Sequence, residues 1–205
     1  MRKLIVSAFL SLDGVVQAPG GPGEDEDGGF TLGGWTVPFF DDHVGAAMGE
    51  LMGRPFDLVL GRRTYDVFAA FWPTAGEDEG AGPLNAATKH VASRGRPTLD
   101  WAGSHLIEGD VAQGVAALKE QDGPELQVHG SGDLVQTLLR HGLVDEWQLL
   151  TFPVVLGSGK RLFGEGALPH SLRVLSSTVS GTGVVITRYA SAGDVVTGSF
   201  GAQGS

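Results

Sequence analysis

Cysteine is absent from this chain, so disulfide bonds, thiolate nucleophiles and thiolate metal ligands are excluded. Long hydrophobic runs are absent too, since no segment approaches the roughly 18 apolar residues that a membrane-spanning helix needs. The apolar run within 1–9 is short and ends near Asp13-Gly14 without a convincing cleavage site, which favours a first strand over a signal peptide. We therefore expect a cytoplasmic protein without a membrane partner.

Basic residues are scarce, with 14 Lys and Arg against 24 Asp and Glu and a formal net charge of −10. Such a chain is poorly suited to nucleic acid, and no nucleic-acid partner is expected. Six of the 14 cations nevertheless follow apolar runs in three short loops. They are Arg62, Arg63, Arg94, Arg96, Lys160 and Arg161. Local positive charge on an acidic protein predicts a small anionic ligand, and ordinary solvated loop charges are the alternative.

The histidine and serine patterns argue against two further kinds of site. The six histidines are scattered, and no pair has the i, i+4 spacing with a nearby carboxylate that a helical metal site needs. We therefore expect no metal. Ser131 lies in Gly130-Ser131-Gly132 and lacks the Gly-x-Ser-x-Gly elbow of a hydrolase. His129, at the end of an apolar run, is more typical of a core or turn histidine than of a proton donor.

The chain of 205 residues, 41% of them hydrophobic, is long enough for one well-developed core. Apolar runs predict strands near 2–10, 57–61, 89–93, 104–107, 125–129, 144–155, 171–180 and 183–190. Helical periodicity predicts helices near 39–53, 63–70, 111–121 and 132–141. The alternation indicates an α/β fold, a mixed, mostly parallel sheet with an antiparallel C-terminal edge. We predict a single domain over 1–190 and a small, polar C-terminal tail over 191–205.

Two loops rich in glycine, proline and acidic residues interrupt this pattern, at 17–35 and 73–82. Neither is expected to bury enough apolar surface to form an element. The first loop directly follows the first strand, where a mobile lid over a ligand site would lie, and a disordered insertion is the alternative.

The stretch 126–139 is the most informative in the chain. An apolar run ends at Gly130 and Gly132 and an amphipathic helical pattern begins at once, which predicts a strand, a tight turn and a helix. Glycines let backbone N–H groups approach a ligand without an intervening Cβ, and the unpaired N–H groups of the helix start face the same space. The turn therefore predicts a phosphate site.

Two more segments, 56–68 and 88–97, carry the same kind of signal. In each, an apolar run ends in a turn that is followed by basic and hydroxyl side chains, which bind phosphate well. These side chains are Arg62, Arg63 and Thr64 after Gly61, and Ser93 and Arg94 in the second segment. Several phosphate-binding segments together indicate one extended anionic ligand, and a dinucleotide fits that description.

Four ordered motifs carry a resemblance to a known family. They are Ser11-Leu-Asp-Gly14, Leu60-Gly-Arg-Arg-Thr-Tyr65, Val128-His-Gly-Ser-Gly132 and Pro153-Val-Val-Leu-Gly-Ser-Gly-Lys-Arg-Leu-Phe163. Over about residues 1–190 the chain resembles the dihydrofolate reductase-like superfamily, and within it the C-terminal reductase domain of the bacterial riboflavin-biosynthesis deaminase-reductase. The resemblance implies a three-layer fold with about eight strands flanked by helices, and an NADPH-dependent reductase of the 5-amino-6-(5-phosphoribosylamino)uracil type.

The resemblance also implies roles for individual residues. The turn that contacts the cofactor phosphates is matched by Gly61, Arg62, Arg63 and Thr64. The loop at the adenosine end is matched by Ser93 and Arg94, and Arg94 would meet a 2′-phosphate. The turn beneath the pyrophosphate is matched by Gly130, Ser131 and Gly132, and Asp133, which follows it, is included in the expected cofactor site.

The candidates for a proton donor on the substrate side are Asp13, Asp41 and Asp42. The folate enzymes place a carboxylate on the first helix after a tryptophan, and here Asp41 and Asp42 follow Trp35. Their distance in sequence from Gly61 is longer than in the folate enzymes, so a folate substrate is not expected. Helix capping is the alternative role of Asp41 and Asp42, and a simple Asp-Gly turn is that of Asp13.

The reaction that we expect is hydride transfer from NADPH to a C=N or C=O bond of a flat heterocycle or sugar-linked imine. A non-catalytic nucleotide-binding module, a flavin- or nucleotide-using enzyme and a true dihydrofolate reductase remain as alternatives. The apolar strand at 147–156, if it lies at a sheet edge, predicts a homodimer.

Overall fold

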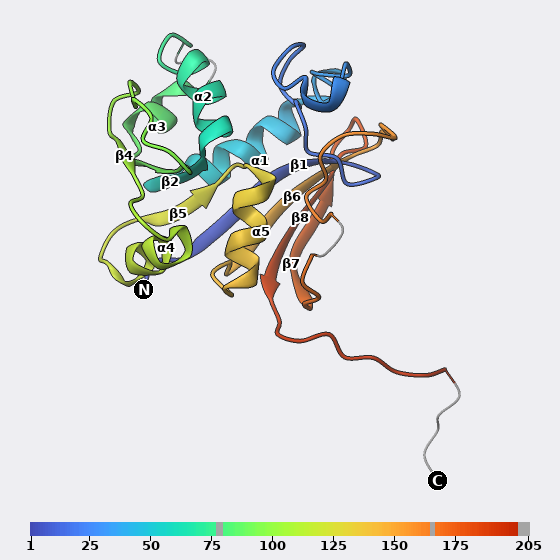
Figure 1. Cartoon of the computed structure of the whole chain (residues 1–205). Coiled ribbons are helices and arrows are strands. Elements are labelled where there is room, and N and C mark those ends of the chain that lie inside the picture. The colour runs from blue at the N-terminus through green and yellow to red at the C-terminus, as the bar shows by residue number, and fades with distance from the viewer. Residues whose placement is uncertain (77–79, 165–166, 201–205) are drawn as a thin grey trace.

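The computed structural model describes residues 1–76, 80–164 and 167–200, and its centre is an eight-stranded sheet (Figure 1). The strand order is β4-β3-β2-β5-β1-β6-β8-β7. The strands are β1 (Leu4–Ser11), β2 (Phe56–Gly61), β3 (Lys89–Ala92), β4 (Ser104–Leu106), β5 (Glu125–Val128), β6 (Glu146–Phe152), β7 (Leu172–Val179) and β8 (Val185–Ser191). Each lies within a predicted run or extends one residue beyond it, so the predicted strands are confirmed.

The sheet is parallel from β4 to β6 and antiparallel where β8 joins β6 and β7 joins β8. Crossover connections produce the parallel part, because the chain must return to the same end of the sheet before each new strand. The predicted mostly parallel sheet with an antiparallel C-terminal edge is confirmed. However, β6 lies between β1 and β8, so the strand at 147–156 is not an edge; the edge strands are β4 and β7.

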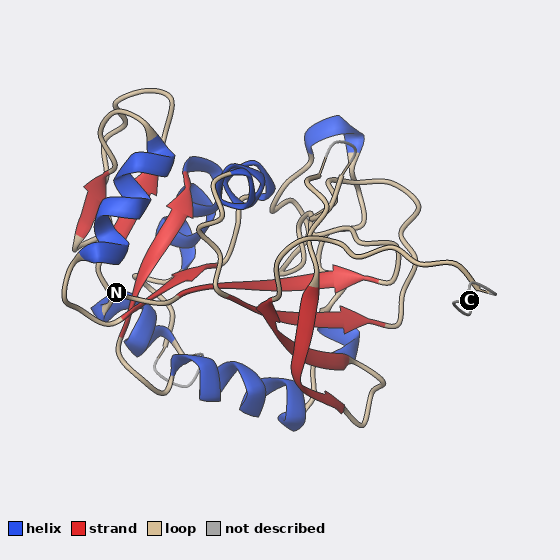
Figure 2. Ribbon diagram, turned by 90° about the horizontal axis from the view of Figure 1, so that it is seen from below, coloured by secondary structure: helices blue, strands red, loops and turns tan. Residues whose placement is uncertain are grey.

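Helices cover both faces of this sheet and make three layers, as expected (Figures 1 and 2). They are α1 (Asp42–Met52), α2 (Arg62–Phe71), α3 (Ala81–Ala86), α4 (Val111–Glu120) and α5 (Gly132–Arg140). On one face Val115 of α4 and Leu138 of α5 pack with Val6 of β1 in one buried cluster. On the other face α1 contributes Val44, and α2 and α3 pack Tyr65 and Leu84 against β2.

Three short helices differ from the sequence prediction. They are α3 and the 3-10 turns η1 (Asp27–Gly29) and η2 (Val37–Phe39). Each is too short to produce a clear helical period in the sequence. Because α3 begins at Ala81, the predicted loop 73–82 ends earlier than expected, and residues 77–79 of that loop lie outside the described residues.

The loop 17–35 packs against the domain, contrary to the prediction that it buries little apolar surface. Phe30 and Trp35 are only 5% and 7% exposed and join the core cluster of β6 and β8. The Trp35 indole N–H donates to the Gln17 carbonyl oxygen at 2.8 Å, which ties the two ends of the loop together. Two segments of the loop, around Gly21 and around Gly33, approach each other closely. This approach needs glycine, since a Cβ on Gly33 would lie 2.4 Å from the Gly21 carbonyl oxygen.

The C-terminal segment 192–200 is exposed; its residues 192–194 hydrogen-bond to Ser171 beside β7, and the remainder runs away from the sheet (Figure 1). The remainder of the predicted tail, 201–205, lies outside the described residues. Within the part of the chain that the structure describes, we find no helix with the length and apolar character to cross a membrane.

Candidate cofactor and substrate site

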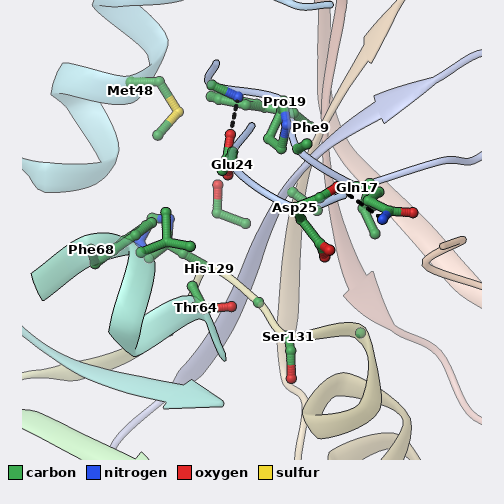
Figure 3. Close-up of a pocket in the computed structure, with 18 of the residues that line it drawn as sticks. Phe9, Gln17, Pro19, Glu24, Asp25, Met48, Thr64, Phe68, His129 and Ser131 are labelled. Atoms are coloured by element: carbon green, nitrogen blue, oxygen red, sulfur yellow. Dashed lines mark hydrogen bonds between the residues drawn. The ribbon is translucent and has the colours of Figure 1, made fainter. Parts of the chain in front are cut away.

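A cavity of about 610 Å³ lies at the carboxyl ends of the central strands, and Figure 3 shows residues that line it. Its walls come from β1, the loop 17–35, α1, α2 and the segment after β6. The turn 130–132 before α5, which we call the glycine turn, also lines it. The carboxyl ends of parallel strands are where ligands bind in open α/β sheets. The volume lies in the usual range of about 300–1,000 Å³ for small-molecule and cofactor sites.

The glycine turn and the start of α2 contact each other at the floor of this cavity. The Gly61 N–H donates to the Gly130 carbonyl oxygen at 3.3 Å, and a Cβ on Gly61 would lie 2.2 Å from Ser131 Oγ. Gly130 has a φ of +128°, and a Cβ there would lie 2.8 Å from Thr64 Oγ1. The peptide bond between Gly130 and Ser131 is cis. Glycine at 61 and 130 therefore allows the two segments to pack in close contact.

Two helix N-termini face the floor. Gly61 is the N-cap of α2 and Ser131 is the N-cap of α5, and neither position makes a side-chain cap hydrogen bond. Figure 3 shows Thr64 of α2 and Ser131 on the same side of the cavity. Uncapped helix N–H groups and the positive ends of two helix dipoles favour an anion at this place.

Two cations stand beside these helix starts, Arg63 on α2 and Lys160 after β6. In the structure both are paired with the loop 17–35. Lys160 Nζ lies 2.7 Å from Asp25 Oδ2 and 2.9 Å from Asp27 Oδ2, and Arg63 pairs with the same two carboxylates. Although burial raises the pKa of Asp25, the hydrogen bond from Lys160 brings it below the usual value. The hydrogen bond to Asp27 raises the pKa of Arg63.

Four other residues predicted to bind the cofactor lie outside the cavity lining: Arg62, Ser93, Arg94 and Asp133. Ser93 directly follows Ala92, which is paired with Gly61 in register, so Ser93 and Arg94 lie at the same edge of the sheet as the glycine turn. They do not line the cavity itself. Arg62 turns away from the cavity to pair with Asp66 at 2.7 Å. Asp133, in the first turn of α5, is exposed and lies outside the cavity lining.

Another part of the cavity wall is apolar. It is formed by Met48 and Met52 of α1, Phe68 and Trp72 at α2, and Leu84 of α3. His129 lies beside this wall, with its ring centroid 6.3 Å from that of Phe68. Burial lowers the pKa of His129 to about 4, so the imidazole is neutral at neutral pH and does not add a positive charge.

None of the three carboxylates predicted as proton donors lines the cavity. Asp13 accepts hydrogen bonds from the Ser11 hydroxyl at 2.7 Å and from the Leu156 and Gly157 N–H groups. These bonds hold the pKa of Asp13 well below its usual range.

Of the two carboxylates at the start of α1, one caps the helix and the other is exposed to solvent. Asp41 is the N-cap of α1, where Oδ1 accepts from the Val44 N–H at 2.9 Å, and it also accepts from the Thr182 N–H. The capping role that the sequence offered as the alternative is the observed one. Asp42 follows as the first residue of the helix and is exposed.

The cavity contains a carboxylate that the sequence analysis did not select, Glu24. Its Oε2 accepts from the Gly20 N–H at 2.6 Å and from the Gly21 N–H at 3.1 Å. Burial raises the pKa of Glu24 above its usual value. Acidic runs in glycine-rich loops are usually solvated, and no pattern in the sequence around Glu24 indicates that its side chain lines a cavity.

The sequence matches the family described as RibD C-terminal domain over residues 2–186. Two Bacillus subtilis proteins are similar in sequence. YyaP is 25% identical over 92% of this chain and 94% of its own length. YwjB is 24% identical over 89% of this chain and 95% of its own length.

Two solved structures are similar in fold. A Shewanella sp. PV-4 protein named for riboflavin biosynthesis superposes with a TM-score of 0.71 and 25% identity, covering 93% of this chain and 99% of its own. A pyrimidine reductase-like protein from Corynebacterium diphtheriae superposes with a TM-score of 0.61 and 14% identity, covering 94% of this chain and 93% of its own.

Proposed function

Because this chain belongs to the RibD C-terminal domain family, we propose that it is an NADPH-dependent reductase acting on a C=N or C=O bond of a small, flat compound. The observation that carries the proposal is the close contact between the starts of α2 and α5, which brings two uncapped helix N-termini together at the floor of the cavity. A floor of this kind fits a pyrophosphate.

The residues around the floor fit the remainder of a dinucleotide. When bound, NADPH supplies the hydride for the reduction. Arg63 and Lys160 are placed to neutralise the pyrophosphate by exchanging Asp25 and Asp27 for phosphate oxygens. Ser93 and Arg94, at the same edge of the sheet, are placed to hold the adenosine end and its 2′-phosphate.

The apolar wall and the loop 17–35 would complete the reaction site. Met48, Phe68 and Trp72 offer a surface against which two flat rings can stack and from which water is excluded. Reduction of a C=N or C=O bond also requires a proton. Glu24 is the carboxyl group that we assign to hold that proton at the cavity, because burial raises its pKa and Asp25 is already paired with two cations.

Titration calorimetry with NADPH and NADH tests the proposal. Each charge-assisted hydrogen bond to the 2′-phosphate is worth roughly 1.5–3 kcal/mol, so NADPH should bind more than about tenfold more tightly than NADH. Equal dissociation constants would contradict the placement of the adenosine end.

A glycine variant tests the floor itself. Gly130→Val should abolish NADPH binding, since its Cβ would lie 2.8 Å from Thr64 Oγ1 at a φ of +128°. Gly109→Val is the matched control, because Gly109 also has a positive φ, +75°, but a Cβ there meets nothing within 4 Å. Retention of native NADPH affinity in a folded Gly130→Val protein would move the phosphate site elsewhere.

A nucleotide-binding module without catalysis is the second candidate. It is favoured by the positions of Asp13, Asp41 and Asp42, which all lie outside the cavity lining. NADPH binding without oxidation of the bound cofactor by any carbonyl acceptor would favour this candidate, and tighter binding of FMN or ATP than of NADPH would favour a different nucleotide.

A further inference from the structure

The positively charged side chains that line the cavity lie in one half of it. Among the described residues that line it, the cations are Arg63 and Lys160. Arg63 precedes Thr64, whose hydroxyl borders Gly130, and Lys160 precedes Arg161, whose carbonyl oxygen would lie 3.8 Å from a Cβ on Gly132. Both cations therefore belong to the glycine-turn half, where the proposed function places the cofactor phosphates.

The second half offers no compensation for an anion. Met48, Met52, Phe68, Trp72 and Leu84 form its wall. The ring nitrogens of His129 do not supply a charge at neutral pH, because burial lowers the pKa of this histidine to about 4. Transfer of a phosphate into such a surface, away from water and without a cation, is strongly unfavourable.

Glu24 makes the second half still less suited to an anion. Its carboxyl group lines the cavity, and Figure 3 shows it held by a hydrogen bond from the backbone of the same loop. When ionised this group repels phosphate, and when protonated it offers one O–H donor but no positive charge. When protonated it can donate to a carbonyl oxygen, and in either state it can accept from a ring N–H, at the rim of a flat ligand.

We propose that the substrate of this protein is an uncharged, flat, largely apolar carbonyl or imine compound without a phosphate group. The inference rests on the proposed function and names its substrate class. It separates this chain from the phosphoribosyl substrate that the family resemblance implied, because a sugar phosphate in the second half would have no cation to pair with.

Paired probes that differ in charge test this substrate class. The protein is saturated with NADP⁺, which cannot reduce the probes, and is titrated at neutral pH with 1,4-naphthoquinone and with 1,4-naphthoquinone-2-sulfonate, following tryptophan fluorescence. Uridine 5′-monophosphate is the phosphate-bearing probe. The absence of cysteine from the chain prevents alkylation of a thiol by the quinones. The neutral quinone should bind at least about tenfold more tightly than either anion.

A lysine placed on the apolar wall should reverse the preference. Met48→Lys should strengthen binding of the sulfonate and weaken binding of the neutral quinone, and Met52→Lys is a second variant if the first does not fold. Ala46→Lys adds the same charge to α1 at an exposed position outside the cavity lining and should leave both affinities unchanged.

The outcomes separate the two proposals. Wild-type binding of uridine 5′-monophosphate or of the sulfonate as tight as that of the neutral quinone overturns the substrate class, as does failure of the neutral quinone to bind. Failure of NADP⁺ to bind overturns the proposed function instead, and the effect of Met48→Lys on the two quinone affinities then still tests the charge preference of the apolar wall.

Discussion

The contact between Gly61 and Ser131 predicts a measurable cost for the smallest possible substitution, Gly61→Ala. The backbone of Gly61 has a φ of −66°, which alanine adopts freely, so the effect comes from packing and not from backbone strain. The added Cβ would lie 2.2 Å from Ser131 Oγ, 3.0 Å from Ser131 Cβ and 3.1 Å from Ser131 N. Rotation of the serine hydroxyl relieves the first contact but not the other two, so the turn itself must move.

Overpacking of this kind costs about 1–3 kcal/mol, and the smaller entropy of the unfolded alanine chain offsets about 0.4–1 kcal/mol of it. We therefore expect a net loss of about 1–2 kcal/mol. This corresponds to a fall in Tm of about 2–4 °C for each kcal/mol in a domain of this size. Because the displaced turn carries the phosphate floor, NADPH affinity should fall at least about tenfold.

A double-mutant cycle assigns this effect to the contact. Ser131→Gly removes the two side-chain atoms nearest to the new Cβ, so the pair Gly61→Ala with Ser131→Gly should recover most of the lost stability, with a coupling energy of about 0.5–3 kcal/mol. Gly82→Ala in α3 is the control. A Cβ there meets nothing within 4 Å, and this variant should be slightly more stable than the parent protein.

Thermal and denaturant unfolding give the stabilities, and calorimetry gives the NADPH affinities. If Gly61→Ala is as stable as Gly82→Ala and binds NADPH with native affinity, the starts of α2 and α5 are not in close contact. In that case the pyrophosphate does not bind at this place.

Two further predictions concern the substrate pocket and the carboxylate of Asp13. Dihydrofolate should be reduced poorly or not at all, because Met48 and Met52 stand where α1 borders the cavity and neither can hydrogen-bond a pterin; brisk NADPH oxidation at the nicotinamide absorbance band would contradict this. Asp13→Asn should lower stability at neutral pH. Because the pKa of Asp13 is lowered, chiefly by the Ser11 hydroxyl, its contribution is present above about pH 4 and is lost as the pH falls further. The Tm difference between variant and parent should therefore narrow below about pH 4, and a constant difference would contradict the assignment.

Local pattern was sufficient for the strands, for the longer helices and for the glycine turns between strand and helix. Among the described residues, the apolar runs and helical periods predicted all eight strands of the sheet and four of the five α-helices, since both depend on side-chain spacing within one segment. Gly130 and Gly132 indicated a phosphate site for the same reason, because a strand, a glycine turn and a helix are adjacent in sequence. Among the described residues, α3 and the 3-10 turns were not predicted, because each is shorter than a recognisable helical period.

The role of each charged side chain depended on tertiary structure. Arg62 and Arg63 are neighbours with the same side chain, yet Arg62 pairs outward with Asp66 and Arg63 lines the cavity, because successive helix positions point in different directions. The sequence could not distinguish them without knowing which face of α2 meets the sheet.

The carboxylates were the part of the site that sequence alone could not assign. Asp13, Asp41 and Asp42 had the expected residue type near the expected strand and helix, but the fold uses Asp13 and Asp41 to hold backbone N–H groups. Glu24 and Asp25 have the sequence surroundings of solvated loop charges. In the fold, however, Asp25 pairs with Lys160, which lies 135 residues later in the chain. The sequence by itself determined the strands, the longer helices and the glycine turns between strand and helix, whereas only tertiary packing decided which charges reach the cavity, because that depends on contacts between segments far apart in the chain.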